Sequence, residues 1–418
     1  MRTLARGTAW MTLSFGGRLT VQAVTFVLVA RALGPRDFGA FAAALAVVSV
    51  AVPFAALGTG NLLVMHVARR PGEFGRRFGA ALTAVPLSAV PLGAAALVVC
   101  AVLVPAVAVE LVVALALAEL VFARAAELAA QAFQAHERMR ATAVLGLVPA
   151  LLRCGAAIAF VALVEGGLLA WAALYLAASA VAALIALSAA VALAGRPASF
   201  RLADLRGGSS FAFGHSAASI YTDIDKTLLA RLGSLQAAGI YAVAYRATSL
   251  AFAPVTALLA TTYARFFRRG ERGIAGSTAL ARELLPFAAG YGVAAGVALY
   301  ALAPVLPIVL GSPYAEAADA LRWLAPLPLV QAVFYLGGDA LTGAGHQRVR
   351  TLLQLGAAAL NVALCILLIP AHSWRGAAWA TLVSLAVLAA AMWAAVGLVS
   401  TRKERRADAR VGLAGVRS

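Results

Sequence analysis

The chain has 418 residues, of which 63% are apolar and only 12% are charged. A soluble domain has roughly 45–50% apolar and about 25% charged residues, so the composition excludes a water-soluble protein and predicts an integral membrane protein. The net charge of +17 would suggest nucleic-acid binding in a soluble protein. Here the basic residues lie between apolar stretches, and no nucleic-acid partner is expected.

Apolar stretches follow one another along the chain, each close to or above the length of about 20 residues that a bilayer-spanning helix needs. The sequence therefore predicts an all-α polytopic membrane protein with about 12 transmembrane helices joined by short loops. The predicted spans are residues 8–30, 38–67, 79–104, 110–133, 141–163, 168–194, 209–231, 239–264, 283–308, 316–341, 351–369 and 376–400.

Basic residues gather in every second loop and in the C-terminal tail. The loops of this side include Arg69, Arg70, Arg76, Arg77, Arg138, Arg140, Arg268, Arg269, Arg348 and Arg350, and the tail includes Arg402, Lys403, Arg405 and Arg406. Since cytoplasmic loops carry the excess of Lys and Arg, we expect a multi-pass protein with both termini in the cytoplasm. Residues 401–418 form the predicted basic cytoplasmic tail.

An internal repeat relates residues 30–70 to a stretch about 200 residues later. The matched positions are Gly34 with Gly233, Gly39 with Gly239, Phe41 with Tyr241, Pro53 beside Pro254, and Arg69–Arg70 with Arg268–Arg269. The repeat places a span, a short outer loop, a second span and a basic inner loop in the same order in both halves. Pro53 and Pro254 are the best candidates for hinges, because a proline inside a span kinks the helix.

The repeat predicts two six-helix bundles, residues 1–200 and residues 201–400, followed by the tail. Because six is an even number of spans, the two halves run parallel, and a pseudo-two-fold axis along the membrane normal is expected to relate them. This architecture is typical of transporters that bind substrate between two bundles and work by alternating access.

Ionisable side chains inside spans are costly against lipid and indicate an internal cavity or an internal pair. Arg18, Arg153 and Arg246 have no acid three or four residues away on their own helix, so they are candidates for binding an anionic substrate. Asp223 and Asp225 lie beside Lys226, and we expect one of the two carboxylates to remain unpaired and to sense a cation.

Pairing between side chains is the alternative for these residues. Arg124 with Glu127 and Asp223 with Lys226 are three residues apart, a spacing that allows ion pairs on one helix face. The three arginines could also act as static struts, paired across helices with Glu119, Asp225 or Asp339. The sequence leaves both interpretations open.

Motifs of catalysis are absent from the sequence. A Walker A loop needs a Lys after Gly, and the only lysines, Lys226 and Lys403, follow Asp and Arg. The triplet from Asp223 to Asp225 is similar to the metal-binding pair of some glycosyltransferases, but it lies inside a predicted span. We therefore expect no enzyme, no catalytic residue, no cofactor and no metal site, and the scattered cysteines are predicted to be packing residues.

Two stretches carry a resemblance to a known family. ALGPRDFGAFAAALAVVS, with ALGTGNLLVMHVARR, follows the first span, and YTDIDKTLLARLGSLQAAGIYAVAYR covers the seventh and eighth. They resemble bacterial polysaccharide-export proteins of the O-antigen flippase type, in the multidrug, oligosaccharidyl-lipid and polysaccharide exporter (MOP) superfamily. The resemblance implies two six-helix bundles in a V shape. Proteins of this type move an undecaprenyl-pyrophosphate-linked oligosaccharide from the inner to the outer leaflet of the bacterial plasma (inner) membrane. The oligosaccharide is then used to build surface polysaccharides such as lipopolysaccharide.

Such families have charged, often basic, central cavities. The resemblance therefore implies that Arg18, Arg153 and Arg246 bind the pyrophosphate. Some members are linked to a cation gradient. The implied partners are the lipid-linked oligosaccharide, membrane lipids and glycan polymerase or ligase proteins. Two other functions remain: a cation-coupled multidrug exporter of the same superfamily, with Glu119 and Glu127 as its carboxylates, and a non-transporting membrane scaffold of glycan assembly.

Overall fold

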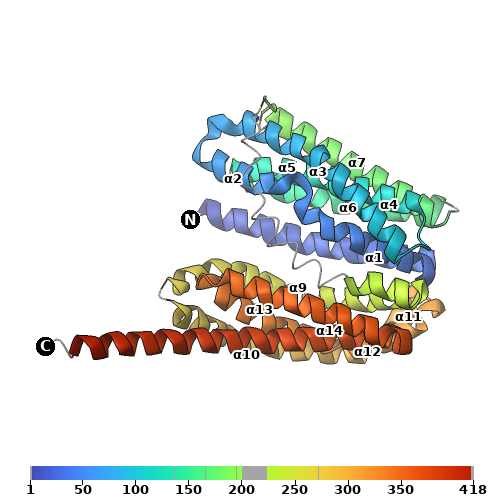
Figure 1. Cartoon of the computed structure of the whole chain (residues 1–418). Helices are drawn as coiled ribbons and strands as arrows, with labels where there is room; N and C mark the ends of the chain where they lie inside the picture. Colours follow the sequence, from blue (N-terminus) through green and yellow to red (C-terminus); the bar gives the residue numbers. More distant parts are fainter. Residues whose placement is uncertain are drawn as a thin grey trace. The chain divides into compact units, whose positions relative to one another are not determined.

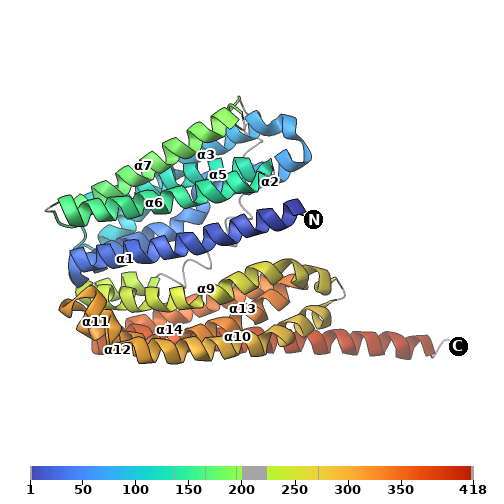
Figure 2. The ribbon, with the colours of Figure 1, turned by 180° about the vertical axis from the view of Figure 1, so that it is seen from behind.

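The computed structural model describes residues 2–136, 138–164, 166–193, 195–199, 224–271 and 273–415. Every regular element in these ranges is helical, so the predicted all-α fold is confirmed (Figures 1 and 2). By length and composition, seven helices of the described chain could cross a membrane, or eight when the bent pair Ser312–Leu324 and Leu327–Gly343 is counted as one span. Two of them, Gly16–Val67 and Gln347–Ser400, have 52 and 54 residues, which is enough for two spans each.

The helices divide into two compact units. Unit 1 comprises Met1–Ala242 and Val309–Tyr314, and unit 2 comprises Val243–Ile308 and Ala315–Ser418. The sequence assigned residue 201 onward to the second bundle, whereas contacts place the helix of residues 224–232 in unit 1. The division into bundles of residues 1–200 and 201–400 stays a prediction.

Unit 1 is built from the N-terminal helices of the chain. They are α1 (Arg2–Ala51), η1 (Val52–Gly58), α2 (Thr59–Arg69), η2 (Pro71–Glu73), α3 (Phe74–Leu103), α4 (Val109–Ala116), η3 (Leu117–Ala123), α5 (Arg124–Ala135), α6 (Met139–Leu163) and α7 (Leu168–Leu193). Buried side chains such as Phe78, Phe133 and Leu63 form a core between α2, α3, α5 and α7. Large apolar side chains also cover the outside of the unit, for example Leu163 with 82% of its surface exposed, as expected for a lipid-facing protein.

Unit 2 contains the later helices. They are most of α9 (Leu235–Gly270), α10 (Ile274–Leu302), the first turn of α11 (Val305–Leu310), α12 (Ala315–Leu324), α13 (Leu327–Gly343) and α14 (Gln347–Gly415). The end of α11 and the short η5 (Ser312–Tyr314) belong to unit 1 instead, where the Tyr314 hydroxyl donates to the Ala30 carbonyl (2.8 Å).

One break separates the first two predicted spans, residues 8–30 and 38–67, and a second break lies inside the second span. Gly34 leaves the helical conformation with φ 71° inside α1, and η1 follows α1 with Ala56 and Leu57 at φ 62° and 53°. The second break, η1, contains Pro53, one of the two predicted hinges. The Ala56 N–H donates to Ser88 Oγ of α3 (2.9 Å). This hydroxyl satisfies a backbone group that a continuous helix would have paired itself.

Two glycines that the repeat matches lie against each other in unit 1. A Cβ added to Gly39 would overlap the Leu235 carbonyl oxygen and lie 2.7 Å from the Gly239 nitrogen, and one added to Gly239 would overlap the Pro35 carbonyl oxygen. Nearby, Thr227 Oγ1 donates to the Ala43 carbonyl (3.3 Å). The second half of α1 therefore meets the start of α9 backbone to backbone, a contact that only glycine permits.

Small residues also join helices within unit 2. Gly292 and Gly296 of α10 face α13 and the turn before it, where an added Cβ would lie 2.7 Å from Leu329 Cα and 2.6 Å from the Ala325 carbonyl oxygen. This pair of small residues therefore allows close helix packing. Pro254, the other predicted hinge, lies within the uninterrupted helix α9.

Candidate functional site

Four of the five predicted site residues lie in the described part of the chain. Arg18, Arg153 and Asp225 belong to unit 1 and Arg246 belongs to unit 2, whereas Asp223 lies outside the described residues. Each is described below within its own unit.

Arg153 lies in α6 and is paired across helices. Its Nη2 atom lies 2.6 Å from Oε1 of Glu119 in η3. Nη2 and Nε also donate to Ser179 Oγ of α7, at 3.1 and 3.4 Å. The guanidinium carbon stands 4.3 Å from the centre of the Tyr175 ring, a cation–π arrangement. The pairing of Arg153 with Glu119 matches the alternative that the sequence left open.

Glu119 is held from a second side by Tyr175, whose hydroxyl donates to the same Oε1 atom at 2.5 Å. Among the described residues, no donor reaches Glu119 Oε2 and no acceptor reaches Arg153 Nη1. The side chains of Arg153 and Glu119 keep 22% and 17% of their surface exposed. Part of this ion pair is therefore still open to a further binding group.

The segment that carries Glu119 has an unusual backbone. η3 is a π-helical turn between α4 and α5, a conformation that frequently marks functional sites. Its sequence LAELVFA contains no glycine or proline that would predict the irregularity. Directly after it, Arg124 Nη1 lies 2.6 Å from Glu127 Oε2, so the predicted pair on this helix is confirmed.

Arg18 lies on the neighbouring helix of unit 1. α1 packs along α6, and a Cβ on Gly17 would lie 3.9 Å from a methyl group of Leu147. At 1.5 Å per residue, Arg153 follows Leu147 by about 9 Å along α6. Arg18 is exposed and has an interaction partner of its own. The structure thus brings two of the three predicted arginines onto adjacent helices.

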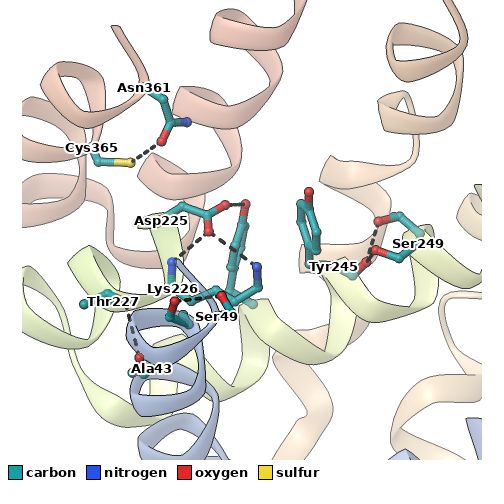
Figure 3. A network of polar contacts seen from close by, with 12 residues as sticks. Ala43, Ser49, Asp225, Lys226, Thr227, Tyr245, Ser249, Asn361 and Cys365 are labelled. Carbon is teal, nitrogen blue, oxygen red and sulfur yellow. Dashed lines mark hydrogen bonds and ion pairs between the residues drawn. The ribbon is translucent and has the colours of Figure 1, made fainter. Parts of the chain in front are cut away.

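Asp225 lies in a buried polar network (Figure 3). The residue is fully buried, and its Oδ1 accepts the backbone N–H of Lys226 (2.8 Å) and lies 3.6 Å from Lys226 Nζ. Its Oδ2 accepts the hydroxyl of the equally buried Tyr241 (2.6 Å). The sequence missed Tyr241 as a partner because the contact joins two helices separated by a turn.

Arg246 lies on α9 in unit 2, half-buried and with an interaction partner. Another ion pair of this unit was missed by the sequence: Arg350 Nη1 lies 2.8 Å from Asp339 Oδ1 and donates to Thr342 Oγ1 (2.9 Å). Arg350 was counted as a loop residue because it follows the predicted end of the tenth span.

Further polar side chains meet inside α14. Asn361 Nδ2 donates to Ser384 Oγ (3.2 Å), and Cys365 Sγ lies 3.7 Å from Asn361 Oδ1 (Figure 3). Cys100 and Cys365 are buried and Cys154 is half-buried, all without a disulfide. Within the described ranges, no group of three His, Cys, Asp or Glu side chains could hold a metal ion.

Comparisons with known proteins give the family and the fold. The family model described as "Polysaccharide biosynthesis protein" matches residues 4–269. A multidrug resistance MATE family transporter of the MOP superfamily, solved facing inward, is similar with a TM-score of 0.77 and 14% identity, over 92% of this chain and 96% of that chain. The outward-facing form gives a TM-score of 0.63 with 14% identity, over 95% and 96%.

A MOP superfamily transporter from Pyrococcus furiosus is similar with a TM-score of 0.66 and 13% identity, over 95% of this chain and 96% of that one. That protein is described as having a binding pocket of reversed polarity, which suggests a different function for it. No curated protein matches the chain. The protein has the fold of MOP superfamily transporters over nearly its whole length. It is a multi-pass membrane protein that belongs to the polysaccharide biosynthesis protein family.

Proposed function

We propose that the protein is a flippase that moves an undecaprenyl-pyrophosphate-linked oligosaccharide across the bacterial plasma (inner) membrane by alternating access. Membership of the polysaccharide biosynthesis family supports a glycan as the cargo. The transporter fold supports movement of that cargo rather than an enzymatic reaction. Membrane lipids surround it, and a glycan polymerase or ligase would take up the product for cell-surface polysaccharide assembly, such as that of O-antigen.

The environment of Arg153 is the observation on which the proposal rests. The residue lies within the apolar helix α6, and one of its Nη groups has no acceptor among the described residues. A pyrophosphate and its sugars cannot cross hydrocarbon unaided, while the polyprenyl tail is able to stay in the lipid. Arginine remains charged at any cellular pH and offers paired donors to phosphate oxygens. We assign the pyrophosphate to Arg18, Arg153 and Arg246.

Replacing the arginines tests this assignment. In a strain that lacks its own copy of the gene, Arg18→Ala and Arg246→Ala should lower export by about tenfold to a hundredfold, the loss of one charged contact, without lowering protein abundance. Lys should rescue only partly because it loses the paired geometry. The measurements are surface polysaccharide and the lipid-linked oligosaccharide left in the inner leaflet. Arg322→Ala is the control, since Arg322 pairs with Asp319 on an exposed face of α12.

Two outcomes would contradict the assignment. If loss of the gene leaves no lipid-linked oligosaccharide behind, the protein is not its flippase. If the charge-swapped double variant Glu119→Arg with Arg153→Glu restores both abundance and export, the pair is a structural strut and Arg153 does not bind the substrate.

We also propose that both termini lie in the cytoplasm. A reporter that is active only outside the cytoplasm should be active when fused after Gly166 or Leu235 and silent after Pro71, Arg138 or Ser418, because the basic loops stay inside. An active fusion after Pro71 would overturn this orientation.

The second candidate is a cation-coupled multidrug exporter, because the similar solved structures include multidrug transporters. A cationic drug would need an accessible carboxylate. Oε1 of Glu119 is bound by Arg153 and Tyr175, and Glu127 is paired with Arg124, so a cationic drug would have to compete with an arginine at either carboxylate. Efflux of ethidium that depends on Glu119, with normal surface polysaccharide, would favour the drug exporter.

A further inference from the structure

We infer that Glu119 is a resident anion on Arg153, which an incoming phosphate group displaces. The inference rests on the proposed function, because that function assigns a pyrophosphate to Arg153. It adds a residue that controls how tightly the substrate binds.

The geometry of the guanidinium sets up a competition. A phosphate takes two parallel N–H donors from an arginine when it binds in the paired arrangement. The Nη2 group of Arg153 already donates to Glu119 Oε1 at 2.6 Å, and Nε points to Ser179. Only Nη1 has no acceptor among the described residues. A phosphate that binds across Nη1 and Nη2 must therefore take the place of the carboxylate.

Tyr175 supports Glu119 when the exchange takes place. Its hydroxyl donates to Glu119 Oε1, and it stands on α7 rather than on the helix of Arg153. The carboxylate keeps this donor when Arg153 turns to another anion, so it does not become a buried charge without any hydrogen bond. The Tyr175 ring meanwhile stays beside the guanidinium.

The exposed surface of the pair gives the anion an approach. Arg153 and Glu119 keep 22% and 17% of their side-chain surface uncovered, whereas Arg350 and Asp339 keep 13% and 6%. A charge inside a span is strongly disfavoured against lipid, so the uncovered face is one that water and polar groups reach. An ion pair that served only to join helices would gain nothing from this opening.

The test measures binding of inorganic pyrophosphate to the purified full-length protein in lipid nanodiscs, by calorimetric titration. Glu119→Gln removes the competing charge and should tighten binding by about tenfold, the effect of one charged hydrogen bond. Tyr175→Phe removes one donor from Glu119 but keeps the ring, and should change affinity severalfold. Because Glu119 without that donor holds Arg153 more strongly, we expect Tyr175→Phe to bind pyrophosphate more weakly than the wild type. Glu127→Gln removes the same charge away from Arg153 and should leave the affinity as in the wild type.

The outcomes separate this inference from the proposed function. If folded Glu119→Gln binds pyrophosphate no more tightly than the wild type, Glu119 does not compete with the phosphate. If Arg153→Gln loses binding in the same assay, Arg153 is still a phosphate site. If Glu119→Gln does not fold, unchanged affinity in Tyr175→Phe overturns it instead. If not even the wild type binds pyrophosphate, the inference fails, while the oligosaccharide assay in cells still decides the flippase function independently.

Discussion

Replacement of Asp225 by alanine is expected to lower the free energy of unfolding by about 3–5 kcal/mol, the effect of removing one partner from a buried ion pair. Asp225 is fully buried and Lys226 is 7% exposed, so water does not replace the lost carboxylate. The hydroxyl of Tyr241 also loses its acceptor. Thermal unfolding of the purified protein and its abundance in membranes measure the effect.

The matched variant is Asp225→Asn, which keeps an oxygen for Tyr241 while removing the charge. It should fold, with a smaller loss of stability than Asp225→Ala. We propose that Asp223 and Asp225 sense a cation, so changing both to Asn should abolish any dependence of transport on sodium or proton gradients. Unchanged gradient dependence in the folded double variant would leave Asp225 with a structural role alone, and Asp319→Asn on the exposed face of α12 serves as the control.

Gly39→Ala is expected to destabilise the protein by about 3 kcal/mol or more, at the upper end of the effects of overpacking. The added Cβ would overlap the carbonyl oxygen of Leu235 and press on the Gly239 nitrogen. These are backbone atoms, which cannot rotate away as a flexible side chain does. Thermal unfolding and membrane abundance are again the measurements.

Gly146→Ala is the control for this effect. Gly146 is also helical, in α6, and an added Cβ would meet no heavy atom within 4 Å. Alanine favours the helix over glycine, so this variant should be as stable as the wild type or more stable. A Gly39→Ala protein that unfolds at the wild-type temperature would show that the close contact of α1 with α9 does not form.

Most of the helical fold was predictable because it depends on apolar length alone. The stretches that became α3, α6, α7 and α10 are long and mostly apolar, and the bilayer allows few alternatives to a helix for such stretches. The break at η1 was predictable only in part. Pro53 indicated a kink, but nothing in the sequence predicts that Ala56 and Leu57 adopt positive φ angles or that the Ala56 N–H pairs with the hydroxyl of Ser88 in another helix.

The candidate site shows the same limit. Burial of charge inside a span identified Arg153 as a special residue, because that argument needs only its position along the chain. Its partner Glu119 lies 34 residues away and Tyr175 is 56 residues from Glu119, so no spacing rule relates them. Such contacts follow from how α6 and α7 pack on η3, and a single sequence does not specify that packing.

The meeting of Gly39 with Gly239 has a consequence for how this chain tolerates change. Where two equivalent positions of a repeat touch, the contact is self-complementary, as it is at the axis of a two-fold symmetric dimer. In such a dimer one substitution changes both subunits at once, so a bulky residue destabilises the contact from both sides. In a single chain that carries both copies, each position mutates by itself. Here an added Cβ on either glycine would meet backbone atoms of the opposite segment. A larger residue at one position therefore cannot be accommodated by a smaller side chain at the other.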